Sequence, residues 1–489
     1  VRNPERALYR RNVVLAQMHK HQLLSTAQYE QLKECPIALA FRVEDHNMGI
    51  ATYFRSVIRD FLLRWTRERG YDLFEDGLKI YTTIDSRLQQ HAEVAVATHM
   101  PTLQAKFEDH WGDTSPWADK HGREIPGFIE NAAKKTALYK KLKEAHGDDQ
   151  EAIDKVMNTP VPTKLFSWQG EIEATTSPIE AIKHNKRLLH AGFMAMDPYT
   201  GHIKAWVGGI SYHHFKYDHV MQSKRQAGSA FKPIVYATAI DNGYTPWQEV
   251  VDTPVTFRIP GGSWTPQNWH KQYTGQKMTL RQAMALSVNT VTAYLTKQLG
   301  PALIVEYAKR LGISSHIDAV PSICLGVADL SVQELVGAYS AFMNKGVWTE
   351  PCFITRIEDK NGRVLETFVP QRREAVSETT AYLMMHMLKG TLEEAGGAAT
   401  RVRKILKIGN ELCGKTGTSS NHSDAWVVGM INSLCAGVWV GGENRCIHFR
   451  SMRLGGGSWA ARPIWEDFIH RIYEDPELNY AKAPLLDHA

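Results

Sequence analysis

Three short motifs in the second half of the chain carry side chains that could perform acyl transfer. They are Ser229-Ala-Phe-Lys232, Ser287-Val-Asn289 and Lys415-Thr-Gly-Thr418. At average residue usage, each of the first two patterns occurs by chance about once in a chain of this length, and K-T-G only about one time in ten. The interpretation therefore depends on where the motifs lie and on what surrounds them.

Ser229 and Lys232 have the spacing of a nucleophile and its base. Gly228 precedes the serine and an apolar run follows it, which predicts that Ser229 lies at a helix N-terminus. Residues i and i+3 share a helix face, so the Lys232 amine should lie beside the Ser229 hydroxyl. A serine nucleophile needs a neighbouring acceptor for its proton, and an amine accepts only when it is uncharged. Burial and a second cation such as Lys415 would lower the pKa of Lys232.

The second motif offers a polar clamp. Ser287 and Asn289 lie near the start of a predicted helix or in the loop that enters it. The Ser287 hydroxyl could relay a proton between Lys232, Lys415 and a leaving amine. The Asn289 amide can bind both Lys232 and a substrate carbonyl.

The third motif lies on a predicted strand. Because side chains alternate along a strand, Thr416 and Thr418 share one face, where two hydroxyls could hold a substrate carboxylate with Lys415 as the counter-charge. Gly417 between them permits close approach of a substrate backbone. The oxyanion of acyl transfer would lie between the backbone N–H groups of Ser229 and Thr418.

The elements that must position these motifs indicate one domain of mixed structure. After Gly192, two apolar strands flank a D-P-Y-T-G turn, which is typical of a hairpin. Helices are predicted at 229–242, 279–299, 302–311, 331–344 and 378–391, and strands at 412–418, 425–431 and 435–441. A hairpin, a helical block and three further strands favour an α+β fold, with an antiparallel sheet and helices packed against its faces.

The first 190 residues are predicted to be mostly helical. Helices are expected at 6–19, 53–65 and 86 to about 98, with a strand at 78–83. From Pro101 to Pro162 the chain turns polar and has few large apolar residues to bury, which is typical of a surface insertion.

Composition narrows the class of protein. A chain of 489 residues with 43% apolar and 22% charged residues indicates a water-soluble globular protein of two or three domains. The net charge of +5 comes from mixed signs without a basic stripe, so nucleic acid is not an expected partner. No apolar run approaches 18 residues, so any membrane anchor is expected outside this chain.

No metal or cofactor is expected from the sequence. The six cysteines form no C-x-x-C pair. His213, His214 and His219 lie close together in sequence, but no acidic or cysteine partner converges on them at ligand spacing.

The three motifs, with QAGSAFKP, TLRQAMALSVNT and GKTGTSSNHSDAWVVG around them, resemble those of the class A penicillin-binding proteins, over most of the chain. The resemblance, nearest to the 1A type of bifunctional peptidoglycan synthase, implies the penicillin-binding/serine β-lactamase-like transpeptidase fold. That fold has a five-stranded antiparallel sheet with helices on both faces, here preceded by a mostly helical linker.

The resemblance also implies a domain division. The opening RNPERALYRRNVVLAQM is similar to the end of the glycosyltransferase domain that precedes the transpeptidase in this family. We expect a glycosyltransferase remnant at 1–40, a linker at 41–190 with the polar insertion at about 101–162, a transpeptidase domain at 191–475 and a C-terminal tail at 476–489. The glycosyltransferase glutamates are expected upstream, so this chain should not polymerise glycan.

The activity implied by the resemblance is that of a serine D,D-transpeptidase acylated by β-lactams, with D,D-carboxypeptidase activity as a side reaction. Its partners would be a D-Ala-D-Ala stem-peptide donor, an amine acceptor and cell-wall activator proteins, at the periplasmic face of the cytoplasmic membrane. The implied catalytic residues are Ser229, Lys232, Ser287, Asn289 and Lys415, and the implied substrate-binding residues are Thr416, Gly417 and Thr418.

Two departures from the family pattern and two rival functions stay open. The middle motif is S-V-N where S-D-N is usual, and Gly396-Gly397-Ala398-Ala399 stands where many relatives have a Gly-Thr pair. A hydrolase, either a β-lactamase or a D,D-carboxypeptidase, would share all three motifs. Steady turnover of penicillin would favour this hydrolase function. A non-catalytic β-lactam sensor would be acylated without releasing product.

Overall fold

The computed structural model describes residues 3–37, 47, 49–119, 121–397, 412–478, 480 and 485. The chain divides into two compact units, Val1–Met48 and Gly49–Ala489. In the described part, no helix combines the length and the apolar character needed to cross a bilayer.

The first unit contains two helices, α1 (Pro4–Lys20) and α2 (Thr26–Glu34). Ser25 and Gln28 form a reciprocal capping box at the start of α2. The rings of His19 and Tyr29 stack with their centroids 5.2 Å apart. No side chain of either helix is fully buried, so packing within this unit contributes little to its stability.

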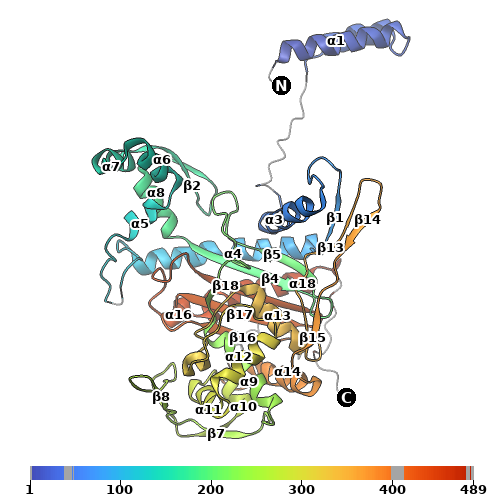
Figure 1. Cartoon of the computed structure of the whole chain (residues 1–489). Coiled ribbons are helices and arrows are strands. Elements are labelled where there is room, and N and C mark those ends of the chain that lie inside the picture. The colour runs from blue at the N-terminus through green and yellow to red at the C-terminus, as the bar shows by residue number, and fades with distance from the viewer. Residues whose placement is uncertain are drawn as a thin grey trace. The chain divides into compact units, whose positions relative to one another are not determined.

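The centre of the second unit is a five-stranded sheet in the order β16-β17-β18-β4-β5, and every neighbouring pair is antiparallel (Figure 1). Its strands are β4 (Leu189–Met196), β5 (Ile203–Val207), β16 (Leu412–Thr418), β17 (Asp424–Ile431) and β18 (Leu434–Gly442). The predicted hairpin and the three predicted strands thus form one sheet, with β16 at its edge. The long apolar runs in these strands follow from burial of both faces.

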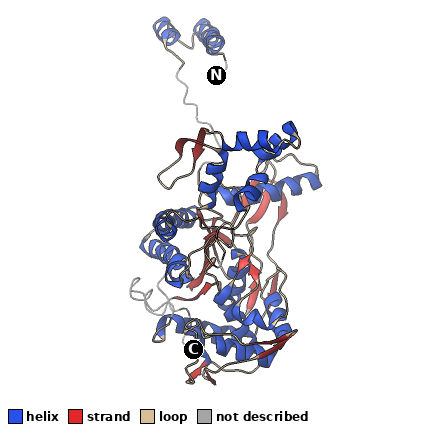
Figure 2. Ribbon diagram, turned by 90° about the vertical axis from the view of Figure 1, so that its left-hand side faces the viewer, coloured by secondary structure: helices blue, strands red, loops and turns tan. Residues whose placement is uncertain are grey.

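Helices cover both faces of this sheet, as predicted (Figure 2). On one face α18 (Arg462–Glu474) packs beside α4 (Ser86–Trp111), and the Phe193 and Phe468 rings meet with centroids 4.6 Å apart. On the other face lie α13 (Val332–Met343) and α14 (Glu378–Glu393). The hydrophobic core therefore lies in two layers, one on each side of the strands.

A helical lobe lies beyond the edge strand β16 (Figure 1). Its helices are η1 (Gly228–Phe231), α9 (Lys232–Asp241), α10 (Leu280–Ala285), α11 (Asn289–Leu299), α12 (Pro301–Arg310) and η2 (Pro321–Leu325). Helix α9 is buried on all sides and contacts α11, α12 and α14. This lobe carries the first two motifs, and the sheet carries the third.

The N-terminal part of the second unit has more helix than predicted. The expected end of a helix near residue 98 is wrong, because α4 continues through Pro101 to Trp111. Met100, Leu103 and Phe107 are buried along this extension. Their burial outweighs the cost of a proline inside a helix.

The remaining elements lie in the N-terminal part of the second unit and in the segments around the sheet. Their helices are α3 (Thr52–Arg69), α5 (Phe128–Lys134), α6 (Ala137–His146), α7 (Gln150–Asn158), α8 (Pro178–Lys186), α16 (Met452–Gly455) and α17 (Gly457–Ala460). Their strands are β1 (Lys79–Thr82), β2 (Val161–Leu165), β3 (Ile172–Thr176), β6 (Arg225–Gln226), β7 (Glu249–Val251), β8 (Phe257–Ile259), β9 (Gly262–Trp264), β10 (Lys277–Thr279), β11 (Asp329–Leu330), β12 (Val347–Thr349), β13 (Ile354–Glu358), β14 (Val364–Thr367) and β15 (Arg372–Glu374).

Candidate active site

Ser229 lies in the tight turn η1, directly before α9. The residue is half-buried, whereas its neighbours Ala230 and Phe231 are fully buried. The Tyr339 hydroxyl on α13 donates to the Ala230 carbonyl at 2.7 Å, which fixes the turn from below. The serine is thus held at the end of a rigid buried helix with one side open.

The turn η1 packs closely against the edge strand β16. A Cβ atom on Gly228 would lie 2.3 Å from the Thr418 carbonyl oxygen, and one on Gly417 would lie 2.6 Å from the Ala227 carbonyl oxygen. Gly228 also has a positive φ of 53°. Only glycine permits this approach, which brings the backbones of Ser229 and Thr418 side by side.

Lys232, at the start of α9, is completely buried. Its amine lies 2.6 Å from the Ser287 carbonyl oxygen, 2.7 Å from Asn289 Oδ1 and 3.2 Å from Ser287 Oγ. Burial, and then the nearby Lys415 amine, hold the pKa of Lys232 well below its ordinary value. The second lysine thus helps to lower the pKa of Lys232, as the sequence predicts.

The contacts of Lys232 fit an uncharged amine. A neutral amine has two N–H groups and one lone pair, and two strong acceptors, Ser287 O and Asn289 Oδ1, lie within hydrogen-bond distance. When the two N–H groups donate to them, the lone pair remains for a hydroxyl proton. The site thus holds Lys232 in the orientation that a base requires.

Ser287 is the residue on which the two lysines converge. Its hydroxyl lies 3.2 Å from Lys232 Nζ and 3.0 Å from Lys415 Nζ. The continuous helix predicted at 279–299 is wrong, because Ser287 has a positive φ of 59° and separates α10 from α11. This left-handed conformation, costly for a serine, presents both the carbonyl and the hydroxyl of Ser287 to Lys232.

Lys415 and the threonines of the third motif point to opposite faces of β16. The Lys415 amine is buried among Ser287 Oγ and its own strand, where it donates to the Thr416 carbonyl at 3.1 Å. Burial lowers the pKa of Lys415 to about 7. Thr418 Oγ1 accepts from the Gly457 N–H at 3.0 Å, so its own O–H is left to donate to a ligand.

A buried network that sequence reasoning missed positions Asn289. Asn268 Oδ1 accepts from the Asn289 N–H at 2.9 Å, and the Gln267 carbonyl accepts from Asn289 Nδ2 at 2.8 Å. Asp252 in turn accepts from Asn268 Nδ2 at 2.8 Å and from the Thr290 hydroxyl at 2.6 Å. The loop 265–276 carries polar residues without periodicity, so no local signal identifies these partners.

A second missed contact joins the segment before Ser229 to the sheet. Arg225 Nε donates to Asp424 Oδ1 at 2.6 Å, and its guanidinium lies 4.8 Å from the Trp439 ring centroid. Trp426 Nε1 donates to the Gln226 carbonyl at 2.8 Å. Asp424 therefore anchors the strand that leads to the nucleophile.

The structure brings Lys232, Ser287, Asn289 and Lys415 into direct contact. Among the hydrogen bonds of the described residues, none joins the Ser229 hydroxyl to Lys232, although the two side chains share one helical turn. Catalytic hydrogen bonds are often loose in a site without substrate.

Of the run that departs from the family pattern, Gly396 and Gly397 are described, and Ala398 and Ala399 lie outside the described residues.

The three singled-out histidines do not lie together. His219 is buried and stacks on Trp439, with ring centroids 4.9 Å apart. His213 and His214 instead meet Glu171. The expectation that no acidic residue converges on them is wrong, because the partner lies 42 residues earlier in the sequence and only the fold brings it near.

The geometry as a whole suits acyl transfer by a serine. The site joins a hydroxyl on a rigid turn, two buried lysines, a bridging serine and the backbone N–H groups of Ser229 in η1 and of Thr418 at the end of β16. In the described residues no carboxylate bonds to either lysine amine, so burial keeps the pair from carrying two charges.

Comparisons with known proteins show which family the chain belongs to. The penicillin binding protein transpeptidase domain matches residues 191–440, and the penicillin-binding protein middle domain matches residues 112–189. Penicillin-binding protein 1A of Aquifex aeolicus is 30% identical over 97% of this chain, and penicillin-binding protein 2D of Bacillus subtilis is 32% identical over 74% of it. The chain spans 64% and 54% of the lengths of these two relatives.

Solved structures share the fold. The crystal structure of penicillin-binding protein 1A from Haemophilus influenzae aligns with a TM-score of 0.68 and 21% identity, covering 99% of this chain and 78% of that one. The PonA1 protein from Mycobacterium tuberculosis, in complex with penicillin V, aligns with a TM-score of 0.58 and 21% identity, covering 86% of this chain and 92% of that one.

Proposed function

Because the chain belongs to the penicillin-binding protein family and has its transpeptidase fold, we propose that it is a peptidoglycan D,D-transpeptidase that is acylated by β-lactams. The observation that carries the proposal is the position of Ser287 between the amines of Lys232 and Lys415, beside the turn that holds Ser229. Such a chain of hydroxyl and amines can move a proton from a nucleophile to a leaving amine.

In the proposed first step, the carbonyl of the penultimate D-Ala of a stem peptide lies between the N–H groups of Ser229 and Thr418. Ser229 Oγ bonds to the carbonyl carbon while its proton passes to the uncharged Lys232 amine. The two N–H groups stabilise the oxyanion that forms. The hydroxyls of Thr416 and Thr418 hold the terminal carboxylate. The expectation that Gly417 admits the substrate backbone is wrong, because the turn that carries Ser229 fills the space beside Gly417.

In the second step, the C–N bond breaks and the terminal D-Ala leaves with a proton delivered from Lys232 through the Ser287 hydroxyl. An amine of a neighbouring stem peptide then attacks the ester carbon of the acyl-enzyme and gives its proton back to Lys232. The ester bond breaks, Ser229 regains its proton, and the two peptides are cross-linked. Lys415 supports this relay, because its charge disfavours the charged form of Lys232 and so keeps that amine uncharged before Ser229 attacks.

We assign the domains as the sequence suggests: a glycosyltransferase remnant at 1–40, a linker at 41–190 with a polar insertion at about 101–162, a transpeptidase domain at 191–475 and a tail at 476–489. The start of that insertion is corrected by α4, because the residues from Pro101 to Trp111 belong to this partly buried helix. Two features support the limits of the transpeptidase domain. Strand β4 begins it, and α18, which ends at Glu474, packs against its sheet. The proposed location is the outer face of the cytoplasmic membrane.

The substrates follow from the same proposal. The donor is a stem peptide that ends in D-Ala-D-Ala, the acceptor is an amine of a second stem peptide, and the enzyme needs no cofactor for this chemistry. We also propose cell-wall activator proteins as partners and D,D-carboxypeptidase activity as a side reaction.

Mass spectrometry of the protein and its products tests this function against its rivals. After incubation with penicillin we expect one stable adduct per chain. With a D-Ala-D-Ala donor and a D-amino-acid acceptor, we expect a transfer product in addition to released D-Ala. Steady release of hydrolysed penicillin would identify a β-lactamase, release of D-Ala without transfer a carboxypeptidase, and an inert adduct without turnover of donor a sensor.

A further inference from the structure

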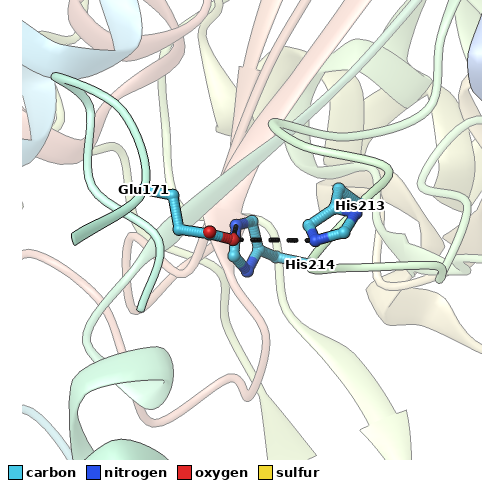
Figure 3. A group of neighbouring side chains, drawn as sticks. All are labelled: Glu171, His213 and His214. Atoms are coloured by element: carbon cyan, nitrogen blue, oxygen red, sulfur yellow. Dashed lines mark ion pairs between the residues drawn. The ribbon is translucent and has the colours of Figure 1, made fainter. Parts of the chain in front are cut away.

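Three side chains of residue types that can bind metals come from distant parts of the sequence and meet at the surface of the second unit (Figure 3). Glu171 lies directly before β3 in the hairpin β2–β3, and His213 and His214 lie in the turn that follows β5. Their nearest ligand atoms all lie within 4.8 Å of one another. The two histidine rings point toward the same carboxylate, as Figure 3 shows.

The distances fit a shared cation better than direct hydrogen bonds. Glu171 Oε2 lies 3.6 Å from Nε2 of His213 and 3.6 Å from Nε2 of His214. Both separations exceed a normal N–H···O distance. Ligands bound at 2.0–2.2 Å around a tetrahedral zinc ion are about 3.3–3.5 Å apart. The two distances from Glu171 thus nearly match the edges of a tetrahedral zinc site, and one ligand atom of each residue lies within 4.8 Å of the other two.

The two oxygens of the Glu171 carboxylate have separate partners. Oε1 accepts from Lys164 Nζ at 2.7 Å, and Oε2 faces both histidines. Lys164 on β2 therefore orients the carboxylate without occupying the oxygen that a metal would bind. Outer partners of this kind commonly hold a metal-binding carboxylate in place.

Aromatic and hydrogen-bond contacts hold the hairpin β2–β3 against the turn after β5 before any ion binds. Phe166, at the end of β2, packs edge-on against the rings of His214 and Phe215, with centroids 5.7 Å away in each case. The Tyr53 hydroxyl donates to the Phe215 carbonyl at 2.6 Å.

We propose that Glu171, His213 and His214 bind a divalent transition-metal ion, with zinc as the best match and water in the fourth position. Two imidazoles and one carboxylate are a donor set that suits zinc. The ion would join the hairpin β2–β3, within the segment that matches the middle domain, to the loop after β5 in the transpeptidase segment. The role is structural and is independent of the proposed acyl transfer.

Zinc titration of tag-free, chelator-treated protein tests the proposal, with binding followed by calorimetry and native mass spectrometry. We expect one ion per chain. Glu171→Gln and His214→Ala should each weaken the affinity at least about tenfold, because each removes one of three ligands. His316→Ala, which alters an exposed histidine elsewhere, is the matched control and should bind zinc like the parent. Absence of saturable binding, or equal binding by all variants, would overturn the assignment.

Cobalt substitution provides a second readout. A site of nitrogen and oxygen ligands should give d–d absorption bands without thiolate charge transfer, and the bands should disappear in Glu171→Gln. Thiolate bands would place the ion on cysteines and contradict the proposal. Labelling by fluorescent penicillin, which uses none of these residues, checks that each variant is folded.

Discussion

Replacement of Ser229 by alanine is expected to abolish covalent labelling of the protein by fluorescent penicillin. The hydroxyl is the proposed acyl acceptor, and the substitution removes the only atom that forms the ester. An alanine would keep the backbone N–H and fit the half-buried position, so the fold should be unchanged. Labelling is measured on denaturing gels and by the mass of the intact protein.

The matched control is Ser86→Ala, which removes an exposed hydroxyl in the first turn of α4. It should be labelled like the parent. Stoichiometric labelling that persists in Ser229→Ala would place the acyl group on another residue and refute the assignment.

Replacement of Lys232 by methionine should lower the rate of acylation by about 10²–10⁴-fold, the usual contribution of a general base. Methionine preserves the length and apolar stem of the side chain but cannot accept a proton. Lys232→Arg should be similarly impaired, because a guanidinium stays protonated at any relevant pH. The second-order rate constant for acylation, measured by stopped-flow fluorescence, gives both values.

Two controls separate loss of the base from loss of the fold. Lys309→Met changes an exposed lysine on α12 and should leave the rate unchanged. Thermal unfolding shows whether a variant at the fully buried position 232 is folded. A folded Lys232→Arg variant that acylates at the parental rate would show that the site needs only a positive charge, contrary to the proposed mechanism.

The prediction for Lys232 rests on the burial of two lysines whose amines bond to no carboxylate among the described residues. An ammonium group in a protein interior is costly, and two such groups side by side are more so. The protein therefore lowers the pKa of Lys415 to about 7 and that of Lys232 well below its ordinary value. The same physical effect that destabilises the charged forms makes an uncharged amine available to Ser229.

The parts of the fold that could be predicted are those set by local pattern. The edge strand was predicted at residues 412–418, where β16 lies, and α13 within one residue at each end. In α13 the apolar residues recur at helical spacing, and Ser331 and Asn344 flank the run. The prediction of β16 rests instead on its place directly before two further strand-like runs. The antiparallel sheet with helices on both faces followed from the order of such segments.

Other features depend on contacts that no local pattern encodes. Ser287 is left-handed because two lysines and the loop before α11 hold it there, and serine has no strong preference for that conformation. Helix α4 passes through Pro101 because large side chains beyond it are buried. Asp252 and Glu171 are ordinary acidic residues in sequence, and only the fold places them beside Asn268 and the histidines.

The account would be tested most directly by the pH dependence of the acylation rate of the unmodified protein with a β-lactam. Only an uncharged amine accepts the Ser229 proton, so the rate rises tenfold per pH unit below the pKa of the base and is constant above it. Because the pKa of Lys232 is lowered, the account predicts a plateau reached well below pH 10. A rate that still rises tenfold per unit up to about pH 10, as an ordinary lysine would give, would contradict it.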